Sequence, residues 1–281
     1  MKNTTFKISN SNNSTISSLK ASKTLFRAYQ FKPLLKFLNS QNRRLLVAAE
    51  VGLGKTIEAG HIMMEMKARR ELRDVLIVCP KSLENKWKEE LFEKFGLGFK
   101  IYETSKDLIS DIKDRRTIRA IVNYEKIRLF RSKEKEDAND ESVPESEGYD
   151  EQRHKRKPLE ETNLATFISQ NPTRFSLVMC DEAHKLRNSE TKTYKGAEIL
   201  MNCADAALFL TATPVMISEE NLYNLLHLLD NVRYFNKQIF YNNLEANRPF
   251  VEALSRLNNN VSLPDIREQL IESEVKVAFY S

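Results

Sequence analysis

Residues that can bind phosphate are grouped in one short stretch of the chain. Gly52, Gly54, Lys55 and Thr56 lie within five positions of one another. Glycines let backbone N–H groups close around phosphate oxygens, a lysine ammonium can reach the outer phosphates of a nucleotide, and a threonine hydroxyl can ligate Mg²⁺. The full phosphate-loop pattern has a glycine at position 49, where this chain has Ala49, which is also small. The stretch predicts a nucleotide–Mg²⁺ site.

Two neighbouring carboxylates, Asp181 and Glu182, form a second group that could do chemistry. They follow the apolar run 177–180, which is typical of a buried strand. Adjacent carboxylates at the carboxyl end of a parallel strand are costly without a cation, and ligands of open α/β sheets bind at that edge. Asp181 suits Mg²⁺ binding, and Glu182 suits orienting or deprotonating an attacking water. The alternative is an acidic surface turn, which the preceding phosphate loop makes weaker.

The elements that must position these residues alternate along the chain. Short apolar runs predict buried parallel strands at 45–49, 75–79, 99–102, 120–124, 177–180 and 206–210. Apolar residues at helical spacing predict helices at 24–38, 55–70, 82–95, 125–130, 221–229, 249–257 and 264–277. This alternation predicts an α/β fold in which helices flank a mainly parallel sheet, followed by a helical C-terminal extension.

The 281 residues suffice for one large domain or two small ones. We expect a disordered leader at 1–20, one lobe at 21–230 and the helical extension at 231–281. Within the lobe, the segment 131–160 is highly charged and has little to bury, so we expect a mobile insertion there. Its basic cluster at 153–157 either neutralises acidic neighbours or contacts nucleic-acid phosphates.

Composition excludes several classes of protein. No apolar run approaches the roughly 18 residues needed to span a bilayer, and the first residues lack the apolar segment of a signal peptide. Cys79, Cys180 and Cys203 lie in apolar contexts without metal-like spacing, which predicts reduced thiols in a cytoplasmic protein. The net charge of +5 is compatible with a polyanionic partner but does not establish one.

Three further features each allow two interpretations. Gln30 either belongs to an ordinary amphipathic helix or reads the edge of an adenine, since an amide both donates and accepts. Trp87, the only tryptophan, either packs in the core or stacks on a base. Thr211 and Thr213 follow the last apolar run and either cap that strand or bond the side chain of His184.

Four segments stand in a fixed order: AAEVGLGKTIEAG, LIVCPKSLENKWKEEL, VMCDEAHKLRN and LTATPV, with Tyr29 and Gln30 upstream. Together they resemble the first RecA-like, P-loop lobe of superfamily-two helicases. Within that group the resemblance is to the Swi/Snf-like ATPases, and more narrowly to bacterial relatives such as the RNA-polymerase-recycling ATPase and helicase-like subunits of phage-defence systems. The resemblance covers residues 24–229, and the string at 50–60 carries the finer assignment.

The resemblance implies ATP and Mg²⁺ as cofactors and gives roles to matching positions. Gln30 would recognise adenine, and the phosphates would be held by Glu50, Val51, Gly52, Leu53, Gly54, Lys55 and Thr56. The metal would bind Thr56 and Asp181. The catalytic residues would be Lys55, Asp181 and Glu182, and nucleotide state would be coupled to nucleic-acid binding through His184, Thr211 and Thr213.

The resemblance also implies a nucleic-acid partner, for which we expect double-stranded DNA. Its backbone would contact Pro80, Lys81 and Ser82 and, as a weaker match, Asn123 and Tyr124. Such contacts give salt-sensitive, largely sequence-independent binding.

One departure from the family pattern is large. Relatives have a second RecA-like lobe, whose arginine completes the ATP site, whereas about fifty residues follow the lobe here and none reads as strand-rich. Arg248, Arg256 and Arg267 lie in helical surroundings. Because an arginine finger contributes about a thousandfold or more in rate, we expect this chain to bind ATP–Mg²⁺ but to turn it over slowly without a second lobe from elsewhere.

Two functional hypotheses from different classes follow. The first is a nucleic-acid-directed ATPase lobe that drives movement along a duplex rather than strand separation. The second is a non-catalytic, nucleotide-gated binding or scaffold subunit, against which the intact Lys55, Asp181 and Glu182 argue. A small-molecule kinase shares the phosphate loop, but the segments at 181–184 and 211–214 disfavour it.

Overall fold

The computed structural model of the chain describes residues 23–24, 27–49, 52–129, 163–171, 173–212 and 218–258, with the backbone alone for 249–258. The expected leader at 1–20, the charged insertion at 131–160 and the helix at 264–277 lie outside the described residues. The proposed domain boundaries therefore stay predictions.

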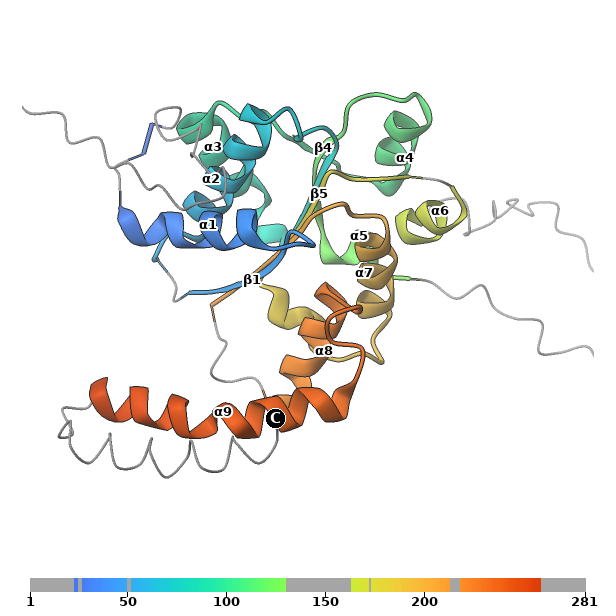
Figure 1. Ribbon diagram of the computed structural model, residues 1–281. Helices are drawn as coiled ribbons and strands as arrows, with labels where there is room; N and C mark the ends of the chain where they lie inside the picture. Colours follow the sequence, from blue (N-terminus) through green and yellow to red (C-terminus); the bar gives the residue numbers. More distant parts are fainter. Residues whose placement is uncertain are drawn as a thin grey trace, which may run out of the picture.

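A six-stranded sheet forms the centre of the molecule (Figure 1). Its strands are β1 (Arg44–Ala48), β2 (Val75–Cys79), β3 (Lys100–Ile101), β4 (Arg119–Asn123), β5 (Leu177–Asp181) and β6 (Ala207–Thr211). The strand order is β1-β6-β5-β2-β4-β3, and every pair is parallel. All residues of β2, β5 and β6 are buried, as continuous apolar runs predict for a sheet covered on both faces.

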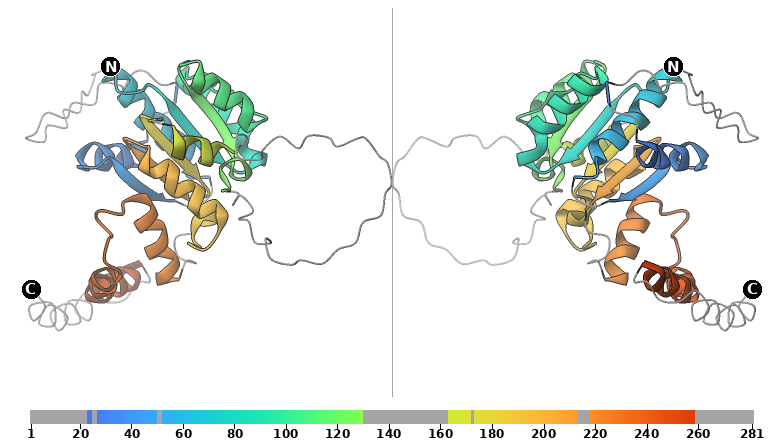
Figure 2. Two further views of the ribbon diagram at one scale, coloured as in Figure 1. Left: turned by 90° about the vertical axis from the view of Figure 1, so that its right-hand side faces the viewer. Right: turned by 90° about the vertical axis from the view of Figure 1, so that its left-hand side faces the viewer.

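Helices cover both faces of this sheet (Figures 1 and 2). One face carries η1 (Ala28–Phe31), α1 (Lys32–Asn39), α2 (Lys55–Ala68), η2 (Lys81–Leu83) and α3 (Glu84–Phe95). The other carries α4 (Ser105–Lys113), α5 (Tyr124–Ile127), α6 (Leu164–Gln170), η4 (Ala183–Leu186), α7 (Lys192–Asn202) and α8 (Glu219–Leu229). Helix α9 (Lys237–Asn258) contacts α8. The predicted α/β fold is confirmed.

Alternate residues of each strand point into two separate cores. In β2, Leu76 and Val78 belong to the core beneath α4–α8, whereas Val75, Ile77 and Cys79 belong to the core beneath α1–α3. This period of two follows from the pleat of the strand. The sheet therefore holds two packed layers in fixed register, and its strand ends lie on a rigid base.

The sequence predicted all six described strands but missed several of the described helices. Helices α4, α6 and α7 were not expected. The start at Pro249 expected for the helix at 249–257 was wrong, because α9 begins at Lys237 and continues through position 249. The later start was expected because proline favours the first turn of a helix. Proline is disfavoured in the interior of a helix but is not excluded from it.

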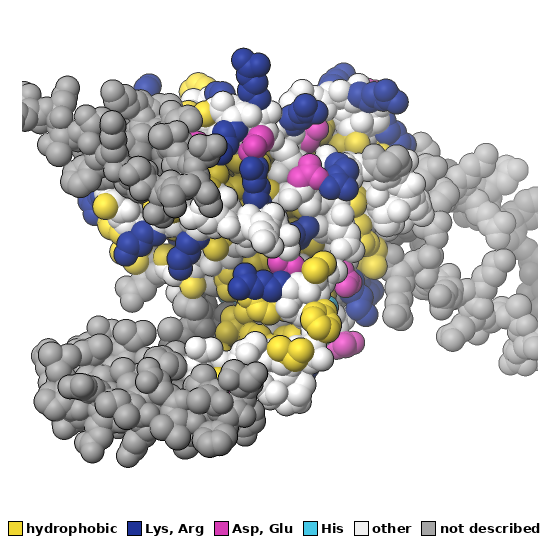
Figure 3. Space-filling view, in the orientation of Figure 1, with side chains coloured by type: hydrophobic (Ala, Val, Ile, Leu, Met, Phe, Trp, Pro, Cys, Tyr) yellow, Lys and Arg dark blue, Asp and Glu magenta, His cyan; other side chains and the backbone are white. Residues whose placement is uncertain are grey.

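Charged side chains are dispersed over one face of the molecule. In the space-filling view, Lys and Arg side chains are spread over the upper part of the face shown, with Asp and Glu side chains among them (Figure 3). None of the described helices is both long and apolar enough to cross a bilayer.

Candidate functional site

The glycine-rich loop lies between the end of β1 and the start of α2. Gly52 and Gly54 have φ values of 89° and 95°, in the left-handed region that glycine adopts without a steric penalty. Gly54 is the N-cap of α2 and has no side chain with which to cap the helix. A helix N-terminus that follows such a turn is suited to bind an anion. Glu50 and Val51 lie outside the described residues.

Two side chains from η1 hold the outer part of this loop. Gln30 Nε2 donates to the Leu53 carbonyl at 3.1 Å, and the Tyr29 hydroxyl donates to the same oxygen at 3.4 Å. Gln30 is 6% exposed, and a Cβ added at Gly54 would lie 2.5 Å from its Nε2 atom. Gln30 therefore packs directly on the loop. Its recognition of adenine stays a prediction.

The Lys55 ammonium bends back onto its own loop. Its Nζ atom donates to the Ala49 carbonyl at 3.1 Å. The Ala49 N–H in turn donates to the Thr211 carbonyl at 3.1 Å, which continues the β1–β6 pairing by one residue. Lys55 is thus kept at the edge of the sheet, and the N–H donors that the Ala49 carbonyl does not use can reach a phosphate oxygen.

Asp181, the last residue of β5, is held by three donors. Trp87 Nε1 donates to its Oδ2 atom at 2.8 Å, and the Glu182 N–H donates to Oδ1 at 2.9 Å. The Tyr124 hydroxyl donates to the Asp181 carbonyl at 2.6 Å. Burial raises the pKa of the Asp181 carboxyl, and the hydrogen bonds from Trp87 and Glu182 oppose that rise. Such a carboxylate is ready to be neutralised by a cation.

Glu182 follows in a left-handed conformation with φ of 54°, which is uncommon for a residue other than glycine. Its Oε2 atom lies 3.2 Å from His184 Nδ1. Thr211 ends β6 and is fully buried, while Thr213 lies outside the described residues. The structure thus brings His184 to Glu182, and the proposed coupling through the two threonines stays a prediction.

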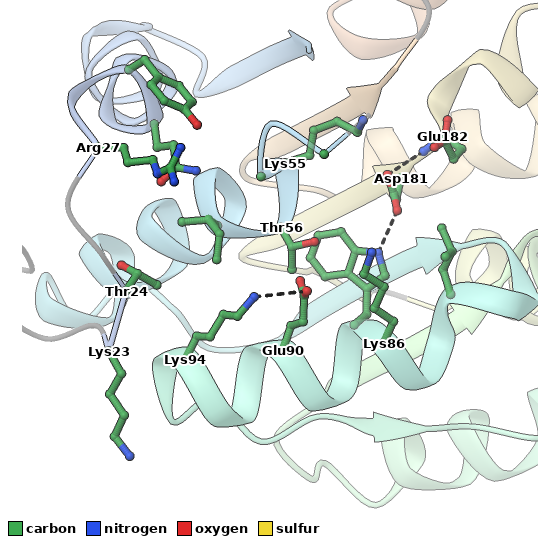
Figure 4. A pocket seen from close by; sticks show the side chains of 17 residues that line it. Lys23, Thr24, Arg27, Lys55, Thr56, Lys86, Glu90, Lys94, Asp181 and Glu182 are labelled. Atoms are coloured by element: carbon green, nitrogen blue, oxygen red, sulfur yellow. Dashed lines mark hydrogen bonds and ion pairs between the residues drawn. The ribbon is translucent and has the colours of Figure 1, made fainter. Parts of the chain in front are cut away.

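A cavity of about 600 Å³ brings the predicted nucleotide residues together (Figure 4). Its volume is in the range of small-molecule sites. Its lining includes the predicted site residues Gln30, Gly52, Gly54, Lys55, Thr56, Asp181 and Glu182. It also includes cationic side chains that sequence reasoning missed: Lys23, Arg27, Lys86 and Lys94. These four lie on the segment before α1 and on α3. Their positive charge was the only feature of the sequence that could have indicated a place in a phosphate-binding site.

The oxygen ligands available in this cavity fit Mg²⁺. The Thr56 hydroxyl and the Asp181 carboxylate both line it. Mg²⁺ commonly takes one or two protein oxygens and completes its shell with phosphate oxygens and water. In the part of the chain that the structure describes, no group of three or more His, Cys, Asp or Glu residues could hold a metal alone. That pattern suits a metal bound together with a nucleotide.

The predicted nucleic-acid residues divide into two sets. Pro80, Lys81 and Ser82 follow β2 at the carboxyl edge of the sheet, and the last two are exposed. Asn123 and Tyr124, at the end of β4, are each 7% exposed, and Tyr124 is committed to Asp181. The first set is accessible to a partner, whereas the second lies below the surface.

Trp87 has a contact that the sequence did not reveal. It is 2% exposed and packs in the core beneath α1–α3, which agrees with the first of its two interpretations. Its N–H, however, donates to Asp181, which lies 94 positions further along the chain. The only available signal was general, namely that a buried indole N–H needs an acceptor.

Comparison with known proteins gives a consistent result. The family described as SNF2-related domain matches residues 29–273. The RNA polymerase-associated protein RapA of Haemophilus influenzae strain PittEE is 28% identical over 255 residues, covering 86% of this chain and 24% of that protein. RapA of Vibrio vulnificus strain YJ016 is 30% identical over 244 residues, with 84% and 22% covered. The chain thus spans about a quarter of the length of these relatives.

A solved structure has the same fold. It is the Sulfolobus solfataricus SWI2/SNF2 ATPase core in complex with dsDNA, with a TM-score of 0.51 and 18% sequence identity. The match covers 75% of this chain and 37% of that one.

Proposed function

Because the chain belongs to the SNF2-related domain family, we propose that it is an ATP-binding lobe that hydrolyses ATP with Mg²⁺ and uses it to move on double-stranded DNA. One observation carries this proposal. The phosphate loop, the Thr56 hydroxyl and the carboxylates of Asp181 and Glu182 line a single cavity at the carboxyl edge of the sheet.

Each residue has a role that its surroundings allow. Lys55 would contact the outer phosphates through N–H donors that the Ala49 carbonyl does not use, while Thr56 and Asp181 would hold the metal. Bound Mg²⁺ would neutralise charge on the phosphates. Glu182 would orient the attacking water and accept its proton, and His184 Nδ1 lies 3.2 Å from that carboxylate.

The nucleic-acid partner rests on two supports. Lys81 and Ser82 are exposed beside the cavity edge, where they can contact a phosphate backbone. The structural neighbour of the same fold is described as a complex with dsDNA. We propose that duplex DNA binds along this edge in a salt-sensitive manner, in the cytoplasm of a prokaryote.

A second lobe completes the proposed site. The chain covers 37% of the Sulfolobus core and about a quarter of each RapA relative. We propose that a further segment or another chain supplies an arginine across the cavity, so that these residues alone support slow turnover. That arginine would contribute about a thousandfold or more in rate.

Steady-state ATP hydrolysis, measured with and without duplex DNA, tests the proposal. We expect slow turnover by the wild-type chain and none above background for Glu182→Gln, which should still bind ATP. Equal turnover by both proteins would place the chemistry elsewhere. Rapid turnover by the chain alone would remove the need for a second lobe, and ATP binding without any turnover even with a second lobe would favour a nucleotide-gated scaffold.

A further inference from the structure

The indole of Trp87 lies between the core of the lobe and the predicted metal ligand. Trp87 is on α3, and its ring packs in the same core as Leu91 and Phe95. One edge of the side chain also lines the cavity. The indole N–H donates to Asp181 Oδ2, 2.8 Å away, in a buried hydrogen bond.

This bond determines how the carboxylate is oriented. The Asp181 side chain can rotate about two bonds, and the Glu182 N–H anchors only Oδ1. The indole anchors Oδ2 from another element, so that both oxygens are fixed. Each carboxylate oxygen can accept more than one bond. The remaining lone pairs of the Asp181 carboxylate are therefore available to a cation in the cavity, and the side chain does not have to change its rotamer.

A second aromatic donor fixes the backbone of the same residue. The Tyr124 hydroxyl donates to the Asp181 carbonyl at 2.6 Å. Tyr124 follows β4, whereas Trp87 follows β2 and η2. Asp181 is thus held by α3 on its side chain and by α5 on its backbone, and both elements rest on the sheet.

Core packing alone does not account for the residue type at position 87. Leu91 and Phe95 lie on the same face of α3 and fill the core without a polar atom. An indole N–H at 2% exposure requires an acceptor, and here the acceptor is the carboxylate predicted to bind the metal.

We propose that Trp87 is a positioning residue for the metal site, whose N–H holds the Asp181 carboxylate in the orientation that binds Mg²⁺ with the nucleotide. This inference rests on the proposed function. Residues that orient metal ligands typically change metal affinity by about 10- to 100-fold when they are replaced. Loss of the indole N–H should therefore weaken Mg²⁺ binding more than nucleotide binding.

Calorimetric titration of the full chain with Mg²⁺ at a fixed concentration of ATPγS tests this directly. For Trp87→Phe we expect the half-saturating Mg²⁺ concentration to rise about tenfold. Binding of ATPγS in EDTA should change less than twofold. Replacement of Trp87 by 3-benzothienylalanine keeps the two-ring shape and removes only the N–H, so it should give the same shift in a chain that folds normally.

Tyr102→Phe is the matched control. The Tyr102 hydroxyl is also a buried aromatic donor to a carboxylate, with 2.7 Å to Asp111 Oδ2, but neither residue lines the site cavity. Its removal should leave the Mg²⁺ dependence unchanged.

The outcomes separate the two proposals. Mg²⁺-dependent binding by the wild-type chain that both Trp87 replacements leave unchanged would overturn the positioning role alone. Wild-type protein that binds no ATPγS with or without Mg²⁺ would overturn the proposed function and the positioning role together. An equal shift in the Tyr102→Phe control would show a general effect of destabilisation and would also overturn the positioning role.

Discussion

The two ends of the parallel sheet are built from similar side chains that are used differently. Both ends have a cavity lined by cationic and acidic residues, of about 600 Å³ at the carboxyl end and about 410 Å³ at the amino end. At the amino end, Arg44 donates to the carbonyls of Leu229, Met201 and Ala204 at 2.7, 2.9 and 3.0 Å. Those hydrogen bonds hold the fold together.

The carboxyl end leaves its charges less neutralised. Among the described residues, no lysine or arginine forms an ion pair with Asp181 or Glu182, and Lys55 donates to one backbone carbonyl. Charged groups that the fold does not neutralise are typical of a binding site. The contrast identifies the functional end more reliably than the presence of a cavity does.

The largest expected effect tests whether the amino end is structural. Arg44→Met removes the guanidinium and leaves three carbonyls without their donor, so we expect the free energy of unfolding to fall by about 2–4 kcal/mol. Nucleotide affinity should stay within twofold at a temperature where the variant is folded. Urea denaturation and calorimetry measure the two quantities. Lys55→Met is the matched control, with the opposite pattern of unchanged stability and lost binding.

The next prediction concerns a buried carboxyl one turn into α2. Burial raises the pKa of Glu58 to about 7, and the Lys55 ammonium partly opposes this rise. Between about pH 4.5 and pH 7 the unfolded chain loses this proton while the folded chain keeps it, so Glu58 lowers stability as the pH rises. A glutamine does not ionise, so we expect Glu58→Gln to reduce this pH-dependent fall in the free energy of unfolding by on the order of 1–3 kcal/mol.

The measurement is the difference in unfolding free energy between wild type and Glu58→Gln at pH 4.5 and pH 8. Burial lowers the pKa of the neighbouring His61 to about 4, which gives the opposite slope as the pH falls below 6.5, but His61 is present in both proteins and cancels. A difference that does not change with pH would show that Glu58 ionises normally in the fold.

A smaller effect compares two glycines within the carboxyl end. Each alanine variant must adopt a left-handed conformation, at a cost of about 1–2 kcal/mol. A Cβ at Gly52 meets nothing within 4 Å, whereas one at Gly54 lies 2.5 Å from Gln30 Nε2. We therefore expect Gly54→Ala to lower the urea midpoint more than Gly52→Ala does. Equal midpoints would mean that Gln30 is not held against the loop.

The smallest effect concerns the outer hydrogen bond of the loop. Tyr29 is 37% exposed and donates to Leu53 at 3.4 Å. We expect Tyr29→Phe to change the free energy of unfolding by less than about 0.5 kcal/mol, because water replaces an exposed donor at little cost. A loss above 1 kcal/mol in urea denaturation would show that this end also depends on its own hydrogen bonds.

The sequence predicted the ends of the strands well for a physical reason. Buried parallel strands are continuous apolar runs, and the polar residues that follow them must gather at one edge. Lys55 and Asp181, far apart in the chain, could therefore be assigned to one site. The family resemblance added the more specific roles.

What the sequence did not reveal depends on tertiary packing. The bond from Trp87 to Asp181 joins residues 94 positions apart, and no local pattern specifies which acceptor a buried indole finds. The helix at 164–170 is only seven residues long, too short for a clear helical period. The burial of Asn123 and Tyr124 at the end of β4 is likewise a result of tertiary packing.

The central claim is that the carboxyl end of the sheet binds a nucleotide together with Mg²⁺. Calorimetric titration of wild type and Lys55→Ala with ATPγS, in the presence and absence of Mg²⁺, tests it most directly. The account predicts one bound nucleotide per wild-type chain, tighter binding with Mg²⁺, and affinity at least about tenfold lower in Lys55→Ala, because the ammonium contacts phosphate. No binding to the wild-type chain, or equal binding by both proteins, would contradict it.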